Sequence, residues 1–241
     1  MSTDAPLSPT VRSTPRRENE RAQSERSALD DVLASSLVCH LAVVVDGVPL
    51  ALPTVFGVDP DGPDEGGTVY VHGSVASRSL VQGPGQEVSV TMTVLDGLVL
   101  ARSGFAHSMN YRSAVVIGRP RVVDDPVERA HALDVLVDHV VPGRAAALRS
   151  PTRKELAATV VLALPLHEAS VKRRAGGPED EEQDVGAAVW CGVVPLSLTA
   201  SLPETAQDAA GTDVPQHVLD RARSLGAVTE GTTAPGGAGV S

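Results

Sequence analysis

An antiparallel hairpin pattern occupies residues 37–58, which read LVCHLAVVVDGVPLALPTVFGV. Two runs rich in β-branched residues flank Asp46-Gly47. An Asp-Gly pair between two apolar runs predicts a type I′ turn, because both central residues of that turn need a positive φ. Pro49 and Pro53 lack a backbone N–H, so the second strand is expected at a sheet edge, at a bulge or in irregular pairing.

Similar patterns along the rest of the chain predict a mainly β protein. Further strands are expected at 68–72, 88–94, 98–102, 111–118, 119–123, 159–166 and 168–173, the last continuing 159–166 after a break. A second Asp-Gly pair, Asp96-Gly97, predicts another hairpin turn. Helices are expected at 20–35, 74–81, 126–140 and 152–157. Because helices do not alternate with the strands, the pattern favours an antiparallel β-barrel with flanking helices over a parallel sheet.

The composition restricts the classes of function. The chain has 241 residues, of which 42% are apolar and 2% aromatic, and its net charge is −10. An acidic surface repels phosphate backbones and few aromatic rings are available to stack on bases, so nucleic acid is not an expected partner. No apolar run is long enough to span a membrane, no secretory signal is recognisable, and Cys39 and Cys191 are too few for a disulfide scaffold. We therefore expect a cytoplasmic protein that does not bind a membrane, and no metal site is predicted.

Three regions are expected along the chain. Residues 1–19 contain three prolines and almost nothing apolar, which predicts a disordered N-terminal tail. Residues 20–199 hold the predicted strands and helices and form the expected domain. Residues 200–241 are rich in Ala, Gly, Thr and Pro and are predicted to be largely disordered, apart from a short helix at 216–225.

The strongest site candidate lies at residues 69–79, which read VYVHGSVASRS. A strand runs into a glycine, and a helical turn with two hydroxyl groups and an arginine follows. Backbone N–H groups together with Ser77, Arg78 and Ser79 can bind a phosphate, with His72 facing the same site from the strand end. The alternative is a surface helix cap that binds no ligand.

Several short blocks, in order along the chain, resemble the pyridoxamine 5'-phosphate oxidase-like flavoproteins with the split-barrel fold. The resemblance extends from about residue 21 to residue 196, and within the family it points to the nitroimidazole-resistance-like, flavin-nucleotide-binding branch. The blocks are CHLA (39–42), GVP (47–49), PTVF (53–56), VYVHGS (69–74), FAHSMNYRSAVVIG (105–118) and EASVKRR (168–174).

The resemblance implies an antiparallel split β-barrel that binds flavin mononucleotide (FMN) in a cleft between the two subunits of a homodimer. The strand that contacts the flavin ring in this family matches Leu52, Pro53, Thr54 and Val55. The positions that hold the ribityl chain and phosphate match His72, Gly73, Ser77, Arg78 and Ser79. Two positions depart from the pyridoxamine phosphate oxidases, since Ser79 stands where they have a lysine and Leu52 where they have an arginine.

Three functions follow from these observations. The first is an FMN-dependent oxidoreductase that acts on a small molecule, in which the flavin carries the redox chemistry. The second uses the deazaflavin F420 in place of the flavin. The third is a non-catalytic carrier or sensor that binds a flavin, either FMN or FAD, or haem. Arg112 and the single tryptophan, Trp190, are further candidates for contacts with a cofactor or with a second subunit.

Overall fold

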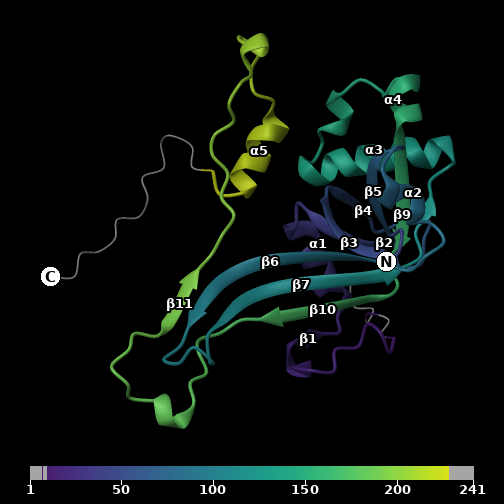
Figure 1. Cartoon of the computed structure of the whole chain (residues 1–241). Coiled ribbons are helices and arrows are strands. Elements are labelled where there is room, and N and C mark those ends of the chain that lie inside the picture. Colours follow the sequence, from purple (N-terminus) through teal and green to yellow (C-terminus); the bar gives the residue numbers. More distant parts are fainter. Residues whose placement is uncertain (1–6, 8–9, 228–241) are drawn as a thin grey trace.

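Two antiparallel sheets form the centre of the protein (Figure 1). The computed structural model describes Leu7 and residues 10–227. The larger sheet has seven strands in the order β1-β10-β7-β6-β2-β3, with β11 paired to β6, and the smaller sheet has the order β4-β5-β9-β8. Every strand pair is antiparallel, which confirms the predicted mainly β, antiparallel architecture.

The larger sheet contains β1 (Ala22–Gln23), β2 (Cys39–Val45), β3 (Val48–Thr54), β6 (Val88–Leu100), β7 (Ser108–Gly118), β10 (Ala169–Arg174) and β11 (Gly192–Pro195). The smaller sheet contains β4 (Phe56–Asp59), β5 (Thr68–Ser74), β8 (Arg121–Val122) and β9 (Thr159–Pro165). The α-helices are α1 (Arg26–Ser35), α2 (Arg78–Gln82), α3 (Pro126–Val140), α4 (Arg153–Ala158) and α5 (Gln216–Ser224). Short 3-10 helices occupy Asn19–Arg21, Ala145–Ala147, Glu182–Asp184 and Gln207–Ala209.

The predicted β2–β3 hairpin is confirmed. Asp46 and Gly47 have φ angles of 50° and 80°, as a type I′ turn requires. The register pairs Val45 with Val48 across this turn, and β3 is the edge strand of the larger sheet. An edge position accommodates the two prolines of β3, because an unpaired strand side needs no N–H donor.

The second predicted hairpin, at Asp96-Gly97, is wrong. Residues 88–100 form one continuous strand, β6, and the turn to β7 lies at residues 101–107. Asp96 forms a β-bulge, since Leu95 pairs with Tyr111 and Gly97 pairs with Asn110. Arg112 donates two hydrogen bonds to the Asp96 carboxylate, at 3.0 and 3.1 Å, and these long-range contacts hold the Asp-Gly pair in the bulge.

Three further boundaries differ from the sequence prediction. The segment after β9 was expected to continue that strand, but β10 lies in the larger sheet and β9 in the smaller one. The helical turn predicted over 74–81 begins only at Arg78, because β5 continues to Ser74. The first helix begins at Arg26, and the residues before it form a short 3-10 turn and β1.

Each face of the smaller sheet supports its own cluster of apolar side chains. Side chains alternate along a strand, so Val69 and Val71 of β5 point into the main core between the two sheets. Tyr70 points to the opposite face, where it packs with Val161 of β9 and Leu136 of α3. The helix α3 therefore covers the outer face of the smaller sheet (Figure 1).

Parts of both predicted tails pack on other segments of the chain. Leu7 is 6% exposed, and Arg12 forms ion pairs with Glu168 and Glu87 at 2.5 and 2.9 Å. In the C-terminal region, the helix predicted at 216–225 appears as α5, where Arg221 Nε donates to the Val140 carbonyl at 2.8 Å. Residues 1–6, 8–9 and 228–241 of these tails lie outside the described residues.

In the part of the chain that the structure describes, the helices are too short or too polar to cross a lipid bilayer.

Candidate functional site

An apolar pocket lies on the outer face of the smaller sheet, beneath α3 and the connection from α3 to β9. Its volume is about 690 Å3, within the range of small-molecule and cofactor sites. The apolar lining consists of Val55, Leu133, Leu136, Val137, Val140, Val141, Leu148, Pro151 and Leu156. The polar lining consists of His72, Arg144, Arg149, Glu155 and Thr159.

The walls of the pocket follow from local sequence. Asp125 caps α3 by accepting hydrogen bonds from the backbone N–H groups of Val127 and Glu128, and Pro126 suits the first helical position. The pocket-lining residues of α3 recur at helical spacing and so form one stripe. The helix α4 contributes Glu155 and Leu156 to the lining and begins with a capping box between Thr152 and Glu155.

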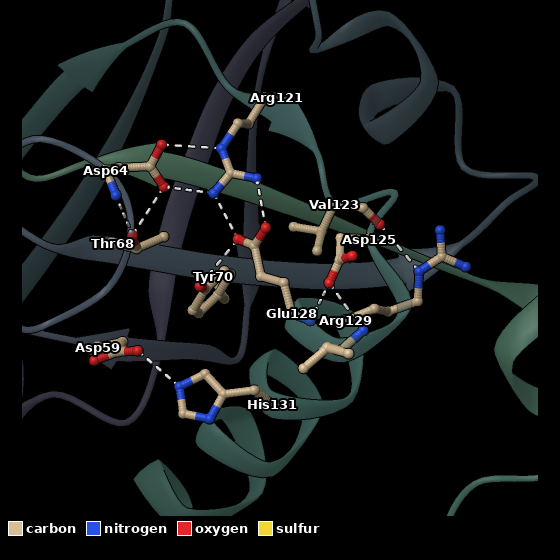
Figure 2. Close-up of polar contacts among 11 residues, drawn as sticks. Asp59, Asp64, Thr68, Tyr70, Arg121, Val123, Asp125, Glu128, Arg129 and His131 are labelled. Atoms are coloured by element: carbon tan, nitrogen blue, oxygen red, sulfur yellow. Dashed lines mark hydrogen bonds and ion pairs between the residues drawn. The ribbon is translucent and has the colours of Figure 1, made fainter.

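A polar network fixes α3 to the sheet at its N-terminal end (Figure 2). Arg121 donates to Asp64 at 2.8 and 2.9 Å and to Glu128 of α3 at 2.5 and 3.0 Å. The hydroxyl of Tyr70 donates to Glu128 at 3.2 Å, and burial together with this carboxylate raises the pKa of Tyr70 to about 12. His131 lies 2.7 Å from Asp59 in the same view. The network thereby sets the position from which α3 covers the pocket.

His72 projects from β5 into this pocket. It pairs with Val161 of β9 and lies on the same strand face as Tyr70, the face that α3 covers. Neither ring nitrogen of His72 has a hydrogen-bond partner among the described residues, and because Nδ1 is fully buried, Nε2 is the nitrogen that a ligand in the pocket can reach. Burial lowers the pKa of His72, so the imidazole is neutral at pH 7. A neutral imidazole with an unused nitrogen in an apolar pocket is suited to bind a metal centre carried by an apolar ligand.

The pocket lining includes three charged side chains, Arg144, Arg149 and Glu155. Arg149 donates to both carboxylate oxygens of Glu155, at 2.6 and 2.9 Å, and both side chains are exposed to solvent. The hydrogen bonds from Arg149 and from Thr152 lower the pKa of Glu155 to about 2. Arg144 is half-buried and pairs with no carboxylate of the described residues.

The strand expected to contact the flavin ring, Leu52–Val55, lies at the exposed edge of the larger sheet and continues into β4. The register pairs Leu52 with Leu41 and Thr54 with Cys39. Because Leu41 and Cys39 belong to the main core, Leu52 and Thr54 lie on the core-facing side of the sheet. Val55 also lines the apolar pocket, as His72 does. Two of the predicted cofactor residues are thus brought together, although the pocket they share is apolar and not a phosphate cradle.

The other predicted phosphate-binding residues lie outside this pocket. Ser77 and Ser79 hydrogen-bond to each other at 2.9 Å, and Ser79 is buried. Arg78 is 68% exposed and forms an ion pair with Asp46 in the β2–β3 turn. Gly73 allows a close approach, since a Cβ there would lie 2.5 Å from Leu80 Cδ1. The binding of a flavin phosphate by these residues stays a prediction.

The two additional candidates have different surroundings. The guanidinium of Arg112 donates hydrogen bonds to Asp96, Asp31 and Ser35, so it is bound to other residues of the same chain. Trp190 is 66% exposed in the segment before β11.

The sequence analysis did not predict the pocket, the presence of Arg144 and Arg149 in its lining, or the position of α3 above it. The available signal was the pair of arginines that flank an apolar stretch directly after the α3 stripe.

Comparison with known proteins decides the family. A family profile described as pyridoxamine 5'-phosphate oxidase matches residues 25–173. The chain belongs to the pyridoxamine 5'-phosphate oxidase family. The sequence-based resemblance and the split-barrel fold class are thereby confirmed for this family member. The comparison with functionally curated proteins finds no match.

Solved structures include two relatives that match nearly their whole length. The flavocytochrome Anf3 from Azotobacter vinelandii is 32% identical, with a TM-score of 0.81 over 89% of this chain and 98% of that chain. The FAD and haem binding protein from Mycobacterium smegmatis is 41% identical, with a TM-score of 0.75 over 85% of this chain and 97% of that chain.

A third structure is similar in fold alone. A putative 5-nitroimidazole antibiotic resistance protein from Bacteroides thetaiotaomicron is 20% identical, with a TM-score of 0.50 over 63% of this chain and 85% of that chain.

Proposed function

We propose that this family member is a redox protein that binds haem in the apolar pocket, with His72 as an iron ligand, and a flavin nucleotide at the β3 edge. The observation that carries the proposal is the imidazole of His72, which lines a large apolar pocket and has no hydrogen-bond partner among the described residues. When bound, haem supplies one-electron chemistry and flavin supplies both one- and two-electron chemistry. The oxidation or reduction of a small molecule at the flavin is part of this proposal.

The residues of the pocket fit haem in three respects. Most of the lining residues are aliphatic, as an apolar macrocycle requires. His72 supplies a neutral imidazole, the commonest protein ligand of haem iron, and burial holds its pKa low enough to keep it unprotonated. Arg144 places a positive charge in the lining that no carboxylate of the described residues offsets, so a carboxylate of haem can be bound there.

The comparisons support the same pair of cofactors. The relative at 41% identity is described as binding FAD and haem, and the relative at 32% identity is described as a flavocytochrome. Both match this chain over most of its length. Of the alternatives that the sequence leaves open, these relatives favour a flavin together with haem, and FAD as the flavin.

The proposed flavin position rests on an uncovered part of the core-facing side of β3. Val48 and Leu50 pair with Val45 and Val43, which are buried, yet they are themselves 55% and 38% exposed. When apolar side chains on the core-facing side of a sheet are not covered by the rest of the chain, they are expected to contact a ligand or another chain. We propose that the flavin ring and a second subunit of a homodimer cover this edge together.

Titration of hemin into cofactor-free protein tests the haem assignment. Wild type is expected to give a sharp Soret band at stoichiometric hemin. His72→Ala removes the proposed iron ligand. Loss of a residue that only hydrogen-bonds to a metal ligand already lowers metal affinity about 10- to 100-fold, so we expect the affinity of this variant for hemin to fall at least ~100-fold. His107→Ala is the matched control, because His107 is exposed in the β6–β7 turn and its one hydrogen bond within the described residues joins it to the Ser103 carbonyl. Wild-type affinity and spectrum in His72→Ala would contradict the proposal.

A further inference from the structure

Arg144 differs from most arginines of the described chain in having no anionic partner. Its side chain is half-buried, lines the apolar pocket, and lies in the connection between α3 and α4. Its backbone N–H donates to the Val141 carbonyl at 3.0 Å, but no carboxylate of the described residues pairs with its guanidinium. Twelve of the 18 arginines of the chain form an ion pair with a carboxylate, whereas Arg144 lines a pocket without such a partner among the described residues.

Arg149, the other arginine of the pocket, is already neutralised. Glu155 accepts two hydrogen bonds from it, and the same carboxylate also accepts from the Thr152 backbone N–H at 2.7 Å. Glu155 therefore keeps Arg149 in place and offsets its charge. The lining carries two guanidinium groups and one carboxylate, so one positive charge remains, and it belongs to Arg144.

We infer that Arg144 binds a carboxylate of the pocket ligand, so that the pocket selects a macrocycle with a free acidic side chain. This inference rests on the proposed function, in which the ligand is haem. A guanidinium binds a carboxylate through two parallel N–H donors, and partial burial strengthens such a pair relative to one in water. With His72 as the ligand of the iron and Arg144 as the partner of a propionate, the two residues fix the orientation of the ring.

The test compares hemin with hemin dimethyl ester, which has the same ring and iron but no free carboxylate. Soret titrations of wild type, Arg144→Gln and Arg144→Lys give the affinities. Arg153→Gln is the matched control, since it removes the same charge from an exposed residue of α4 that is outside the pocket lining.

We expect Arg144→Gln to weaken hemin binding by about 10- to 100-fold, the effect of losing one charged hydrogen-bond partner, and Arg144→Lys to weaken it less. The ester should bind wild type and Arg144→Gln equally, and Arg153→Gln should bind hemin as wild type does.

Two results would overturn the inference while leaving the proposed function intact. One is unchanged hemin affinity in Arg144→Gln, and the other is an equal loss for hemin and its ester, which would mean that Arg144 only shapes the pocket. A wild type that binds neither compound would overturn the proposed function, and the carboxylate site with it.

Discussion

Gly57 determines how closely α3 approaches the smaller sheet. A Cβ at this position would lie 2.9 Å from the backbone nitrogen of Leu136 and 3.0 Å from its Cα. The backbone of a helix cannot move aside as the end of a side chain can, so Gly57→Ala is expected to displace α3. The free energy of unfolding should fall by about 1–3 kcal/mol, the usual cost of overpacking, and haem affinity should fall with it.

Urea unfolding checks this prediction against Gly104→Ala. A Cβ at Gly104 would meet nothing within 4 Å, so that variant should unfold like wild type. Equal stability of the Gly57 and Gly104 variants would show that the helix is not held against the sheet at this point.

His72 and His139 are expected to make stability depend on pH. Burial lowers the pKa of each imidazole below the ordinary value of about 6.5, which both groups regain in the unfolded chain. The unfolded chain therefore takes up protons at higher pH than the folded chain. The free energy of unfolding should fall as the pH is lowered through about 6.5 toward the folded values, and it should be flat above that.

Urea denaturation of the cofactor-free protein between pH 8 and 5.5 measures this slope. The double variant His72→Gln/His139→Gln should have a smaller slope than wild type, whatever its absolute stability. An unchanged slope would assign the pH dependence to other groups.

At the scale of elements, α3 depends on the Arg121 network that joins it to β8 and to the loop before β5 (Figure 2). Arg121→Gln leaves the partly buried carboxylates of Asp64 and Glu128 without their cation. A charged hydrogen-bond partner contributes roughly 1.5–3 kcal/mol, and partial exposure of Arg121 reduces this, so we expect a loss of about 1–2 kcal/mol.

The control is Arg119→Gln, which removes an exposed ion pair with Glu87 and should change stability by less than about 0.5 kcal/mol. Burial tends to raise the pKa of Asp64, but its hydrogen bonds from Arg121 and Thr68 outweigh this and lower the pKa overall. Its contribution is therefore complete above the ordinary value of about 3.9 and is lost as the pH falls below it. Wild type and Arg121→Gln should converge in stability at acid pH, and a constant difference would exclude the carboxylates as the cause.

The two Asp-Gly pairs show why some elements are predictable from sequence and others are not. Asp46-Gly47 forms a turn because everything the turn needs lies in the pair and its two flanking strands. Asp96-Gly97 has the same local chemistry, yet Arg112 binds Asp96 and β11 pairs with the strand beyond it. Such partners are distant in sequence, and a local pattern does not contain them. The helix α3 was predictable to the residue because its cap and apolar stripe are local.

The site was predictable only in part for the same reason. His72 could be singled out at the end of a strand, but its pocket is built by α3 and by residues 141–156, whose docking on β5 is a long-range contact. Arg78 could be singled out by its neighbours, but its ion pair with Asp46 depends on how α2 packs against the β2–β3 turn. Surface ion pairs are weak, so this pair still permits the predicted phosphate contact.

At the scale of the whole molecule, the uncovered face of β3 predicts a homodimer. A specific interface buries at least about 1,200 Å2, and Val48 and Leu50 are expected at its centre. Light scattering at micromolar concentration should give the mass of a dimer for wild type and of a monomer for Leu50→Glu. The monomer should lose flavin but keep haem, because Leu50 is outside the lining of the His72 pocket. A monomeric wild type would contradict this arrangement.

The central claim is that one chain holds both cofactors and that His72 binds the haem. The most direct measurement is the haem and flavin content, per chain, of full-length wild type and His72→Ala purified from haem-supplemented cells. Wild type is predicted to contain both, with a Soret band and an acid-extractable flavin, and His72→Ala to retain the flavin without the haem. A wild type that contains flavin alone, or a His72→Ala variant with full haem content, would contradict the claim.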